Sequence, residues 1–189
     1  RFGGDNSALC VRQGNTVIEI KTFQSMDLMQ LCGAVKNLYD DATAMEQPQE
    51  ILVDVIGLGS GVVDRLAEQN LPVRGVNVAE APSTKKNYLN LRAELWFAVK
   101  DWLAQRDCRL PENDELASEL AAPQYKYTST GKIKIESKDE MRKRGIKSPD
   151  KADALALTMA SSAASFGGSQ SYLGYNFKKP LKSRIFRVG

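Results

Sequence analysis

Residues 51–57 have the sequence Ile-Leu-Val-Asp-Val-Ile-Gly. A short run of branched apolar residues predicts a strand covered on both faces, as in the middle of an α/β sheet. Asp54 interrupts this run, and a carboxylate there is costly to bury unless it is paired, hydrogen-bonded or bound to a metal. The stretch therefore predicts an inner strand and a candidate functional acid.

The residues that follow extend this strand into a crossover unit. A glycine-rich turn at 57–61 leads into a predicted helix at 62–69, and residues 71–78 predict the next strand, parallel to the first. An acid on a strand followed by Gly-x-Gly-x-Gly also resembles the first motif of nucleotide-type methyltransferases. Glu80 suits the acid of a dinucleotide site, although the third glycine comes one place early. A cofactor-binding enzyme therefore stays open as a minor alternative.

A second candidate site lies in residues 147–157, Lys-Ser-Pro-Asp-Lys-Ala-Asp-Ala-Leu-Ala-Leu. Pro149 fits the first turn of a helix, and Ser148 is expected to cap it. Asp150 and Asp153 are three residues apart, so they share one face of this helix near its N-terminus. Neighbouring carboxylates repel unless a positive charge lies between them, and a hard divalent cation is the usual partner. The structural alternative is that one Asp complements the helix dipole while the other is solvated.

The composition excludes several kinds of chemistry. The chain of 189 residues contains no histidine, which excludes His-dependent triads and His-ligated zinc. Its three cysteines are scattered, so neither a disulfide framework nor a zinc cluster is predicted, which suits a reducing cytoplasm. We find no P-loop, and expect neither a membrane span nor a signal peptide. Carboxylates and metal remain the simplest chemistry.

Positive charge gathers beside the acidic helix, although the net charge is only +3. The candidate DNA contacts are Lys126, Lys132 and Lys134 of a predicted hairpin, followed by Lys138, Arg142 and Lys147. Basic runs that flank carboxylates suit a polyanionic partner. Solvated surface, or lysines that protect an exposed strand edge, is the structural alternative.

The other segments complete a single α/β domain. Strands are predicted at 8–12 and 16–23, helices at 27–41 and 87–106, a solvated acidic helix at 112–120, and a hairpin at 125–137. We predict that residues 1–165 form the domain and that residues 166–189 form a basic, partly flexible tail.

Taken together, these segments resemble the C-terminal nuclease domain of the large terminase subunit of tailed bacteriophages. The resemblance covers nearly the whole chain up to about Ala160. It is carried by Arg-Phe-Gly-Gly-Asp-Asn-Ser at 1–7, by Val-Asp-Val and the glycines within 53–61, by Asn-Leu-Arg-Ala-Glu-Leu-Trp at 90–96, and by residues 138–155. The last of these is the strongest.

The resemblance implies an RNase H-like fold, a mixed sheet flanked by helices, here with an added β-hairpin. It also implies an Mg²⁺- or Mn²⁺-dependent endonuclease that uses two ions to cut concatemeric double-stranded DNA when packaging starts and ends. Asp54 matches the central-strand acid of the family and Asp153 the late-helix acid. Asp150 stands where related nucleases place an additional ligand, and Asp5 is a further candidate ligand.

The resemblance also implies partners and a location. These are viral double-stranded DNA, an upstream ATPase domain of the same polypeptide, the portal protein and the small terminase subunit, in the host cytoplasm and without a membrane. The family's first catalytic acid lies a few residues before the motif at 1–7, so it is expected to be missing from this sequence, and the activity of the chain as given stays open. The alternative is a catalytically silent module that docks DNA or the portal.

Overall fold

The computed structural model describes residues 6–43, 46–83, 86–160 and 184–188. A five-stranded mixed sheet forms its centre, in the order β2-β1-β7-β3-β4. The strands are β1 (Ser7–Gln13), β2 (Thr16–Phe23), β3 (Glu50–Asp54), β4 (Val73–Val76) and β7 (Arg184–Val188). β1 pairs antiparallel with β2 and β7, whereas β3 pairs parallel with β4 and β7. The predicted strands at 8–12 and 16–23 and the predicted crossover unit are therefore confirmed.

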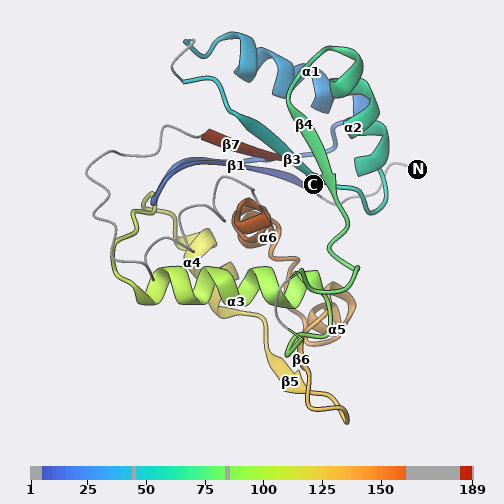
Figure 1. Ribbon diagram of the computed structural model, residues 1–189, viewed down its shortest axis with the longest axis vertical. Coiled ribbons are helices and arrows are strands. Elements are labelled where there is room, and N and C mark those ends of the chain that lie inside the picture. The colour runs from blue at the N-terminus through green and yellow to red at the C-terminus, as the bar shows by residue number, and fades with distance from the viewer. Residues whose placement is uncertain (1–5, 44–45, 84–85, 161–183, 189) are drawn as a thin grey trace.

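Helices cover both faces of the sheet (Figure 1). On one face lie α1 (Leu28–Asp40) and α2 (Gly59–Glu68). On the other lie α3 (Leu91–Ala104), α4 (Asp114–Ala121) and α6 (Asp150–Leu157), which continues into a short 3-10 helix at Thr158–Ala160. This arrangement gives a three-layer α/β domain whose sheet is enclosed on both sides.

The domain has two hydrophobic cores, one on each face of the sheet, because successive side chains of the inner strands point to opposite faces. Leu9 and Ile51 pack with the buried residues of α1 and α2, whereas Cys10 and Leu52 pack with those of α3 and α6. Successive side chains of a strand point to opposite faces, so an unbroken apolar run supplies both cores at once. The apolar stretch that contains Asp54 is an inner strand for this reason.

Helix α6 is the most deeply enclosed helix on its side of the sheet. Every residue of α6 from Lys151 to Leu157 is buried. Its alanines keep the helix narrow, which allows it to lie directly between the sheet and α3 (Figure 1). The helix therefore holds its first turn in a fixed place relative to the sheet.

The start of α6 differs from the sequence prediction. Pro149 is the N-cap residue rather than part of the first turn, and it makes no capping hydrogen bond through its side chain. The hydroxyl of Ser148, predicted as the cap, instead donates to Asp150 Oδ1 at 2.7 Å. Side-chain caps do occur elsewhere, as where Ser137 and Glu140 form a capping box at α5 (Lys138–Lys143).

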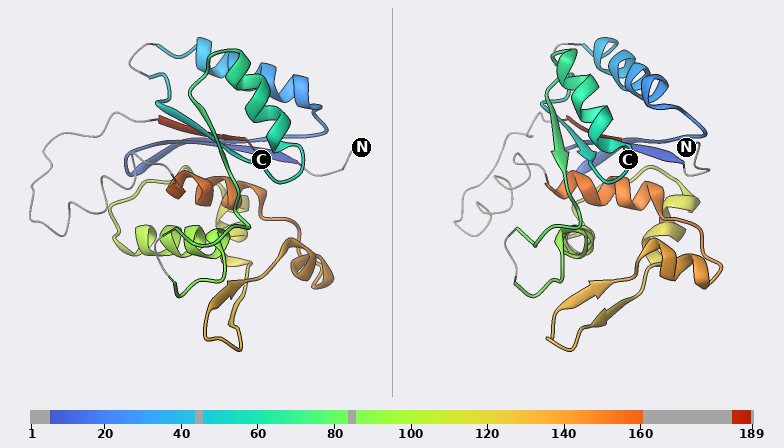
Figure 2. Two further views of the ribbon diagram at one scale, coloured as in Figure 1. Left: turned by 45° about the vertical axis from the view of Figure 1, so that its right-hand side comes forward. Right: turned by 90° about the vertical axis from the view of Figure 1, so that its right-hand side faces the viewer.

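The predicted hairpin is present as β5 (Tyr125–Tyr127) and β6 (Ile133–Ile135). It projects from the body of the domain below α3, next to α5 (Figure 2). Phe97 of α3 packs edge-on against Tyr125, with ring centroids 5.3 Å apart, and Tyr125 in turn packs against Tyr127. These contacts fasten the base of the hairpin to α3.

Strand β7 is a departure from the sequence prediction. Its residues fall in the stretch predicted to be a basic, partly flexible tail, yet they lie inside the sheet between β1 and β3. The sequence Arg-Ile-Phe-Arg-Val is rich in the branched and aromatic residues that strands favour. The predicted boundary at residue 165 thus leaves out one strand of the sheet. Across the described ranges, none of the helices is both long and apolar enough to span a bilayer.

Candidate active site

The first turn of α6 presents the two predicted acids. The backbone N–H of Asp153 donates to Pro149 O at 2.8 Å, so residues 150 and 153 belong to the opening turn of the helix. Both side chains are largely enclosed, with exposed fractions of 13% for Asp150 and 8% for Asp153. Carboxylates near a helix N-terminus are stabilised by the local dipole, which lowers the cost of holding two of them together.

One oxygen of Asp153 is held by helix α3. Trp96 donates from Nε1 to Asp153 Oδ1 at 2.8 Å, and Arg92 donates to the same oxygen from Nη2 at 3.1 Å and from Nε at 3.3 Å. These donors are four residues apart on α3, and the Arg92 guanidinium lies 5.7 Å from the centre of a Trp96 ring. Arg92 Nη1 also donates to the carbonyl of Glu136 at 2.6 Å. Oδ1 is thereby fixed in place.

The other oxygen of Asp153 faces a lysine. Lys138 Nζ, from the first turn of α5, lies 3.6 Å from Asp153 Oδ2 and 2.9 Å from Asp150 Oδ1. The ammonium group therefore bridges the two carboxylates. The structure brings Asp150, Asp153 and Lys138 together, three of the residues that the sequence analysis singled out.

Asp54 lies at the end of β3, where the chain turns into α2. Its Oδ1 accepts a hydrogen bond from the backbone N–H of Ile56 at 3.1 Å. The turn depends on glycine, because Gly57 has a φ of +75° and a Cβ on Gly59 would lie 1.6 Å from the carbonyl oxygen of Asp54. The glycines that follow the strand thus shape the backbone around the acid.

The predicted metal ligands do not all meet. Asp5 lies outside the described residues. Within the described ranges, no group of three or more histidine, cysteine, aspartate or glutamate residues is arranged to hold a metal ion. The carboxylate oxygens of these residues are nevertheless the type of ligand that a hard divalent cation prefers. Asp150 and Asp153 already share one positive group, the ammonium of Lys138.

Sequence reasoning missed Glu119, because α4 was predicted to be a solvated surface helix. Glu119 is half-buried, and its Oε2 accepts a hydrogen bond from the backbone N–H of Ala152 at 2.9 Å. Burial, with a smaller contribution from the negative charge of Asp150, raises the pKa of Glu119 to about 7. Glu115 of the same helix pairs with Lys151. The four-residue spacing of these two glutamates was the available signal, since it places both on one face of α4.

A cavity of about 730 Å³ adjoins Asp150. Asp150 and Glu119 form part of its wall, and Arg142 and Lys147 form another part. The cavity also reaches Thr22 at the end of the β1–β2 hairpin. It therefore places carboxylates and basic side chains around one space, as binding of a phosphodiester at a cation-dependent site would require.

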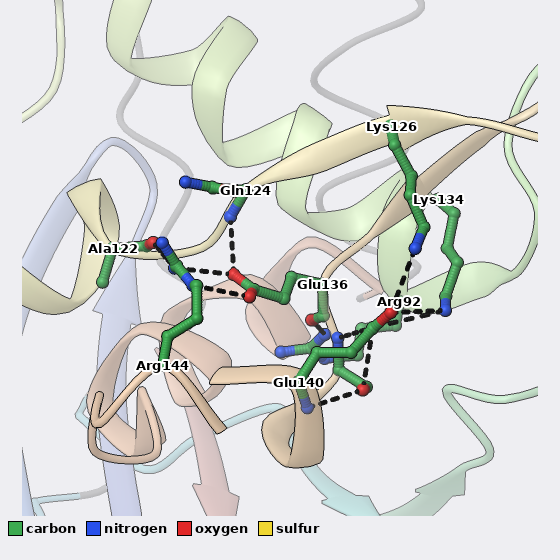
Figure 3. A network of polar contacts seen from close by, with 9 residues as sticks. Arg92, Ala122, Gln124, Lys126, Lys134, Glu136, Glu140 and Arg144 are labelled. Atoms are coloured by element: carbon green, nitrogen blue, oxygen red, sulfur yellow. Dashed lines mark hydrogen bonds and ion pairs between the residues drawn. The ribbon is translucent and has the colours of Figure 1, made fainter. Parts of the chain in front are cut away.

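Several predicted DNA contacts already have acidic partners. Glu140 binds Lys126 at 3.1 Å and Lys134 at 3.2 Å, as Figure 3 shows. Hydrogen bonds from the backbone and hydroxyl of Ser137, followed by those from the two lysines, hold the pKa of Glu140 well below its usual range. The two hairpin lysines are therefore tied to α5 by one carboxylate.

The remaining basic candidates differ from one another. Arg142 pairs with Asp139 at 3.3 Å on the exposed side of α5. For Lys132 and Lys147, the part of the chain that the structure describes contains no ion-pair partner. Lys147, like Arg142, lines the cavity that Asp150 also lines.

Solved structures with the same fold were found. The nuclease domain of the large terminase subunit gp2 of bacterial virus Sf6 matches with a TM-score of 0.69 and 24% identity over 83% of each chain. A variant of that domain with manganese and beta-thujaplicinol matches with a TM-score of 0.70 and 22% identity, again over 83% of each chain. The large terminase nuclease of thermophilic phage G20c with bound magnesium matches with a TM-score of 0.64 and 16% identity, over 85% of this chain and 78% of that one.

No protein-family model matches the sequence, and no curated protein is a significant match. The chain nevertheless has the RNase H-like fold of terminase nuclease domains, so the resemblance inferred from its motifs is confirmed at the level of the fold.

Proposed function

We propose that this chain is the nuclease domain of a phage DNA-packaging motor, a divalent-metal-dependent endonuclease that cuts concatemeric double-stranded DNA when packaging starts and ends. The observation that carries the proposal is the carboxylate pair of Asp150 and Asp153, fixed at the first turn of an enclosed helix in a fold shared with terminase nuclease domains. Two of the matching structures contain manganese or magnesium, which supports the use of such ions.

The residues of the chain have distinct roles in this proposal. Asp54, Asp150 and Asp153 would hold two Mg²⁺ or Mn²⁺ ions, with Asp5 as a further candidate ligand. Bound there, the ions would lower the pKa of a water molecule and neutralise charge on the phosphodiester. Arg92 and Trp96 orient Asp153 by holding Oδ1, which leaves Oδ2 directed toward the space between the two carboxylates.

In this proposal the basic residues bind the DNA substrate. Lys147 and Arg142 line the same cavity as Asp150 and would hold the DNA backbone, while the hairpin lysines would extend the contact. Phosphate contacts of this kind position a duplex without reading its sequence. We expect the portal protein, the small terminase subunit and an upstream ATPase domain as partners, and the host cytoplasm as the location.

Nicking of supercoiled plasmid tests the proposal. The chain, and a version that carries the preceding sequence in which the resemblance places another acid, are incubated with Mn²⁺, Mg²⁺ or Ca²⁺. Cleavage in Mn²⁺ or Mg²⁺ that disappears in the Asp153→Asn variant is the expected result. Folded protein that cleaves under none of these conditions would refute it.

The second candidate is a catalytically silent module that docks DNA or the portal. One observation favours it, namely that Arg92 and Lys138 together already balance the two negative charges of the pair. For this module, replacement of Asp54 would leave both metal binding and DNA cleavage unchanged.

A further inference from the structure

The two residues that precede α6, Ser148 and Pro149, do not cap its first backbone N–H groups. Pro149 makes no capping hydrogen bond through its side chain, and the hydroxyl of Ser148 acts as a donor rather than an acceptor. The helix opens with the bond from Asp153 N to Pro149 O, so the N–H groups just before Asp153 have no acceptor within the helix. Lys151 and Ala152 are buried, and an unpaired N–H on either would therefore be costly.

Glu119 of α4 supplies the missing acceptor. Its Oε2 accepts the N–H of Ala152 at 2.9 Å, although the two residues are 33 positions apart in the chain. Burial raises the pKa of Glu119, and the backbone N–H groups of Ala152 and Lys151 oppose that rise because they stabilise the ionised carboxylate. Glu119 therefore does from another helix what the side chain of an N-cap residue does from within its own segment.

Helix α4 holds Glu119 in a fixed place. The side chain of Asn113 caps α4 by accepting the N–H of Leu116 at 2.8 Å, and Leu116 is buried in the core on this side of the sheet. Glu115, one turn before Glu119, pairs with the ammonium group of Lys151. Two successive turns of α4 thus contact the start of α6, and the acceptor for Ala152 is anchored to the core of the domain.

The capped segment joins the two candidate metal ligands. Lys151 and Ala152 are the residues that lie between Asp150 and Asp153 in the chain. A change in the backbone of this turn would move both carboxylates relative to each other. Metal affinity depends on groups that orient the ligands as well as on the ligands themselves. The hydrogen bond from Ala152 to Glu119 is therefore placed to control the geometry of the pair.

We propose that Glu119 is a positioning residue, which caps α6 from α4 and thereby fixes the spacing of Asp150 and Asp153 for a divalent ion. The inference rests on the proposed function, because it takes these two acids as ligands. It goes further by giving α4 a part in metal binding through a side chain that need not touch the ion. The oxygen that accepts the N–H, rather than the negative charge of Glu119, is what the site requires.

Two neutral substitutions isolate the role of the acceptor. Glu119→Gln and Glu119→Met both remove the negative charge, but only glutamine keeps an oxygen that can accept the N–H. Each metal-depleted protein is titrated with Mn²⁺ by calorimetry. We expect Glu119→Met to bind Mn²⁺ about tenfold more weakly than Glu119→Gln, which corresponds to about 1.4 kcal/mol. Glu115→Gln and Glu115→Met form the matched control pair and should have equal affinity, because Glu115 contacts the side chain of Lys151.

Amide hydrogen exchange of the metal-free proteins tests the cap itself. The N–H of Ala152 should exchange faster in Glu119→Met than in Glu119→Gln, because only the second variant retains an acceptor for it. Equal exchange of this amide in the two folded variants would overturn the cap.

The outcomes separate the inference from the proposed function. Equal Mn²⁺ affinity in Glu119→Gln and Glu119→Met would overturn the inference and leave a metal-dependent nuclease intact. A difference of the same size between the two Glu115 variants would also overturn it, because any contact between α4 and α6 would then have this effect. Absence of Mn²⁺ binding in the parent and in every folded variant would overturn both.

A further variant answers the question if Glu119→Met does not fold. Glu119→Asp keeps the charge but shortens the side chain by one methylene group, so its carboxylate should no longer reach the N–H of Ala152. We expect Glu119→Asp to bind Mn²⁺ about tenfold more weakly than the parent. An affinity equal to that of the parent would overturn the positioning role.

Discussion

Arg92 and Asp153 form an enclosed ion pair, with 3.1 Å between Nη2 and Oδ1, that joins α3 to the first turn of α6. The same arginine reaches the carbonyl of Glu136, immediately after the β5–β6 hairpin. One side chain therefore connects the candidate catalytic acid to the hairpin, so the position of Asp153 depends on three separate parts of the chain.

Replacement of Arg92 by methionine should affect both stability and metal binding. Asp153 would keep its charge in an enclosed place without its main partner, which should lower the free energy of unfolding by about 2–4 kcal/mol. Loss of the contact that orients a ligand should weaken Mn²⁺ binding about ten- to a hundredfold. Urea unfolding and calorimetry measure the two effects. Arg142→Met is the control, because its ion pair is exposed and should contribute less than about 1 kcal/mol.

Asp153→Asn should abolish metal-dependent nicking while the domain remains folded. The sequence alone suggests that this change relieves repulsion between two acids, but the structure shows that Asp153 is balanced by Arg92 and Lys138. We therefore expect the free energy of unfolding to fall by about 1–3 kcal/mol in metal-free buffer. Asp139→Asn, a 79% exposed carboxylate on α5, is the matched control for both measurements. Retention of nicking by folded Asp153→Asn would remove this residue from the proposed site.

Glu119 should make the domain less stable as the pH rises toward neutrality. Burial raises its folded-state pKa from 4.5 to about 7, so the folded state binds the proton more tightly than the unfolded state. The resulting stabilisation is complete below about pH 4.5 and is lost as the pH rises through 7. Glu119→Gln should therefore be more stable than the parent at pH 8, by about 1–2 kcal/mol, and this advantage should disappear by pH 5. Thermal unfolding of both proteins in the presence of a chelator, from pH 5 to pH 8, tests this prediction. A stability difference between Glu119→Gln and the parent that does not change with pH would contradict it.

Substitution of alanine for Gly59 and for Gly33 should change the free energy of unfolding in opposite directions. Gly59→Ala forces a methyl group into the carbonyl oxygen of Asp54, so the turn must move and the free energy of unfolding should fall by about 3 kcal/mol or more. Gly33 lies within α1 with nothing within 4 Å of an added methyl group. Gly33→Ala should therefore stabilise the domain by about 0.5–1 kcal/mol through helix propensity. Chemical unfolding of the two variants side by side gives the comparison.

Lys147→Ala should weaken DNA binding more than Lys36→Ala does. Lys147 lines the cavity beside Asp150, whereas Lys36 pairs with Asp40 on α1, on the opposite face of the sheet. Loss of one phosphate contact should reduce the salt dependence, the slope of log affinity against log salt, by about 0.9. Binding to labelled duplexes of unrelated sequence, measured over a range of salt, should show the same loss for each duplex. An unchanged slope would assign Lys147 to protein contacts.

The sequence was a good guide to the elements and a poorer guide to the partners within the site. The apolar run that contains Asp54 and the spacing of Asp150 and Asp153 are local patterns, and local patterns predict strands and helix faces. The partners of Asp153 lie far away along the chain, on α3 and α5, so no local pattern could pair them. Glu119 was missed for the same reason, because its partner Ala152 is a backbone group on another helix.

The predicted cap of α6 was wrong because of a local interaction of Ser148. Ser148 had the residue type of an N-cap, but its hydroxyl donates to Asp150 instead. A capping hydroxyl must turn its oxygen toward a backbone N–H as the acceptor, whereas the carboxylate of Asp150 orients this hydroxyl as a donor. The negative charge that made Asp150 a functional candidate is thus also the reason that Ser148 does not cap the helix.

Strand β7 has a consequence for the order of events in biosynthesis. It comes late in the chain but occupies the middle of the sheet, between β1 and β3. During synthesis from the N-terminus, the β2–β1 pair and the β3–β4 pair therefore exist as separate halves, each with an unpaired inner edge, until residues 184–188 emerge. Pairing across almost the whole chain is slow, and exposed strand edges invite association with other chains. The nascent domain should thus depend on chaperones longer than its size alone suggests.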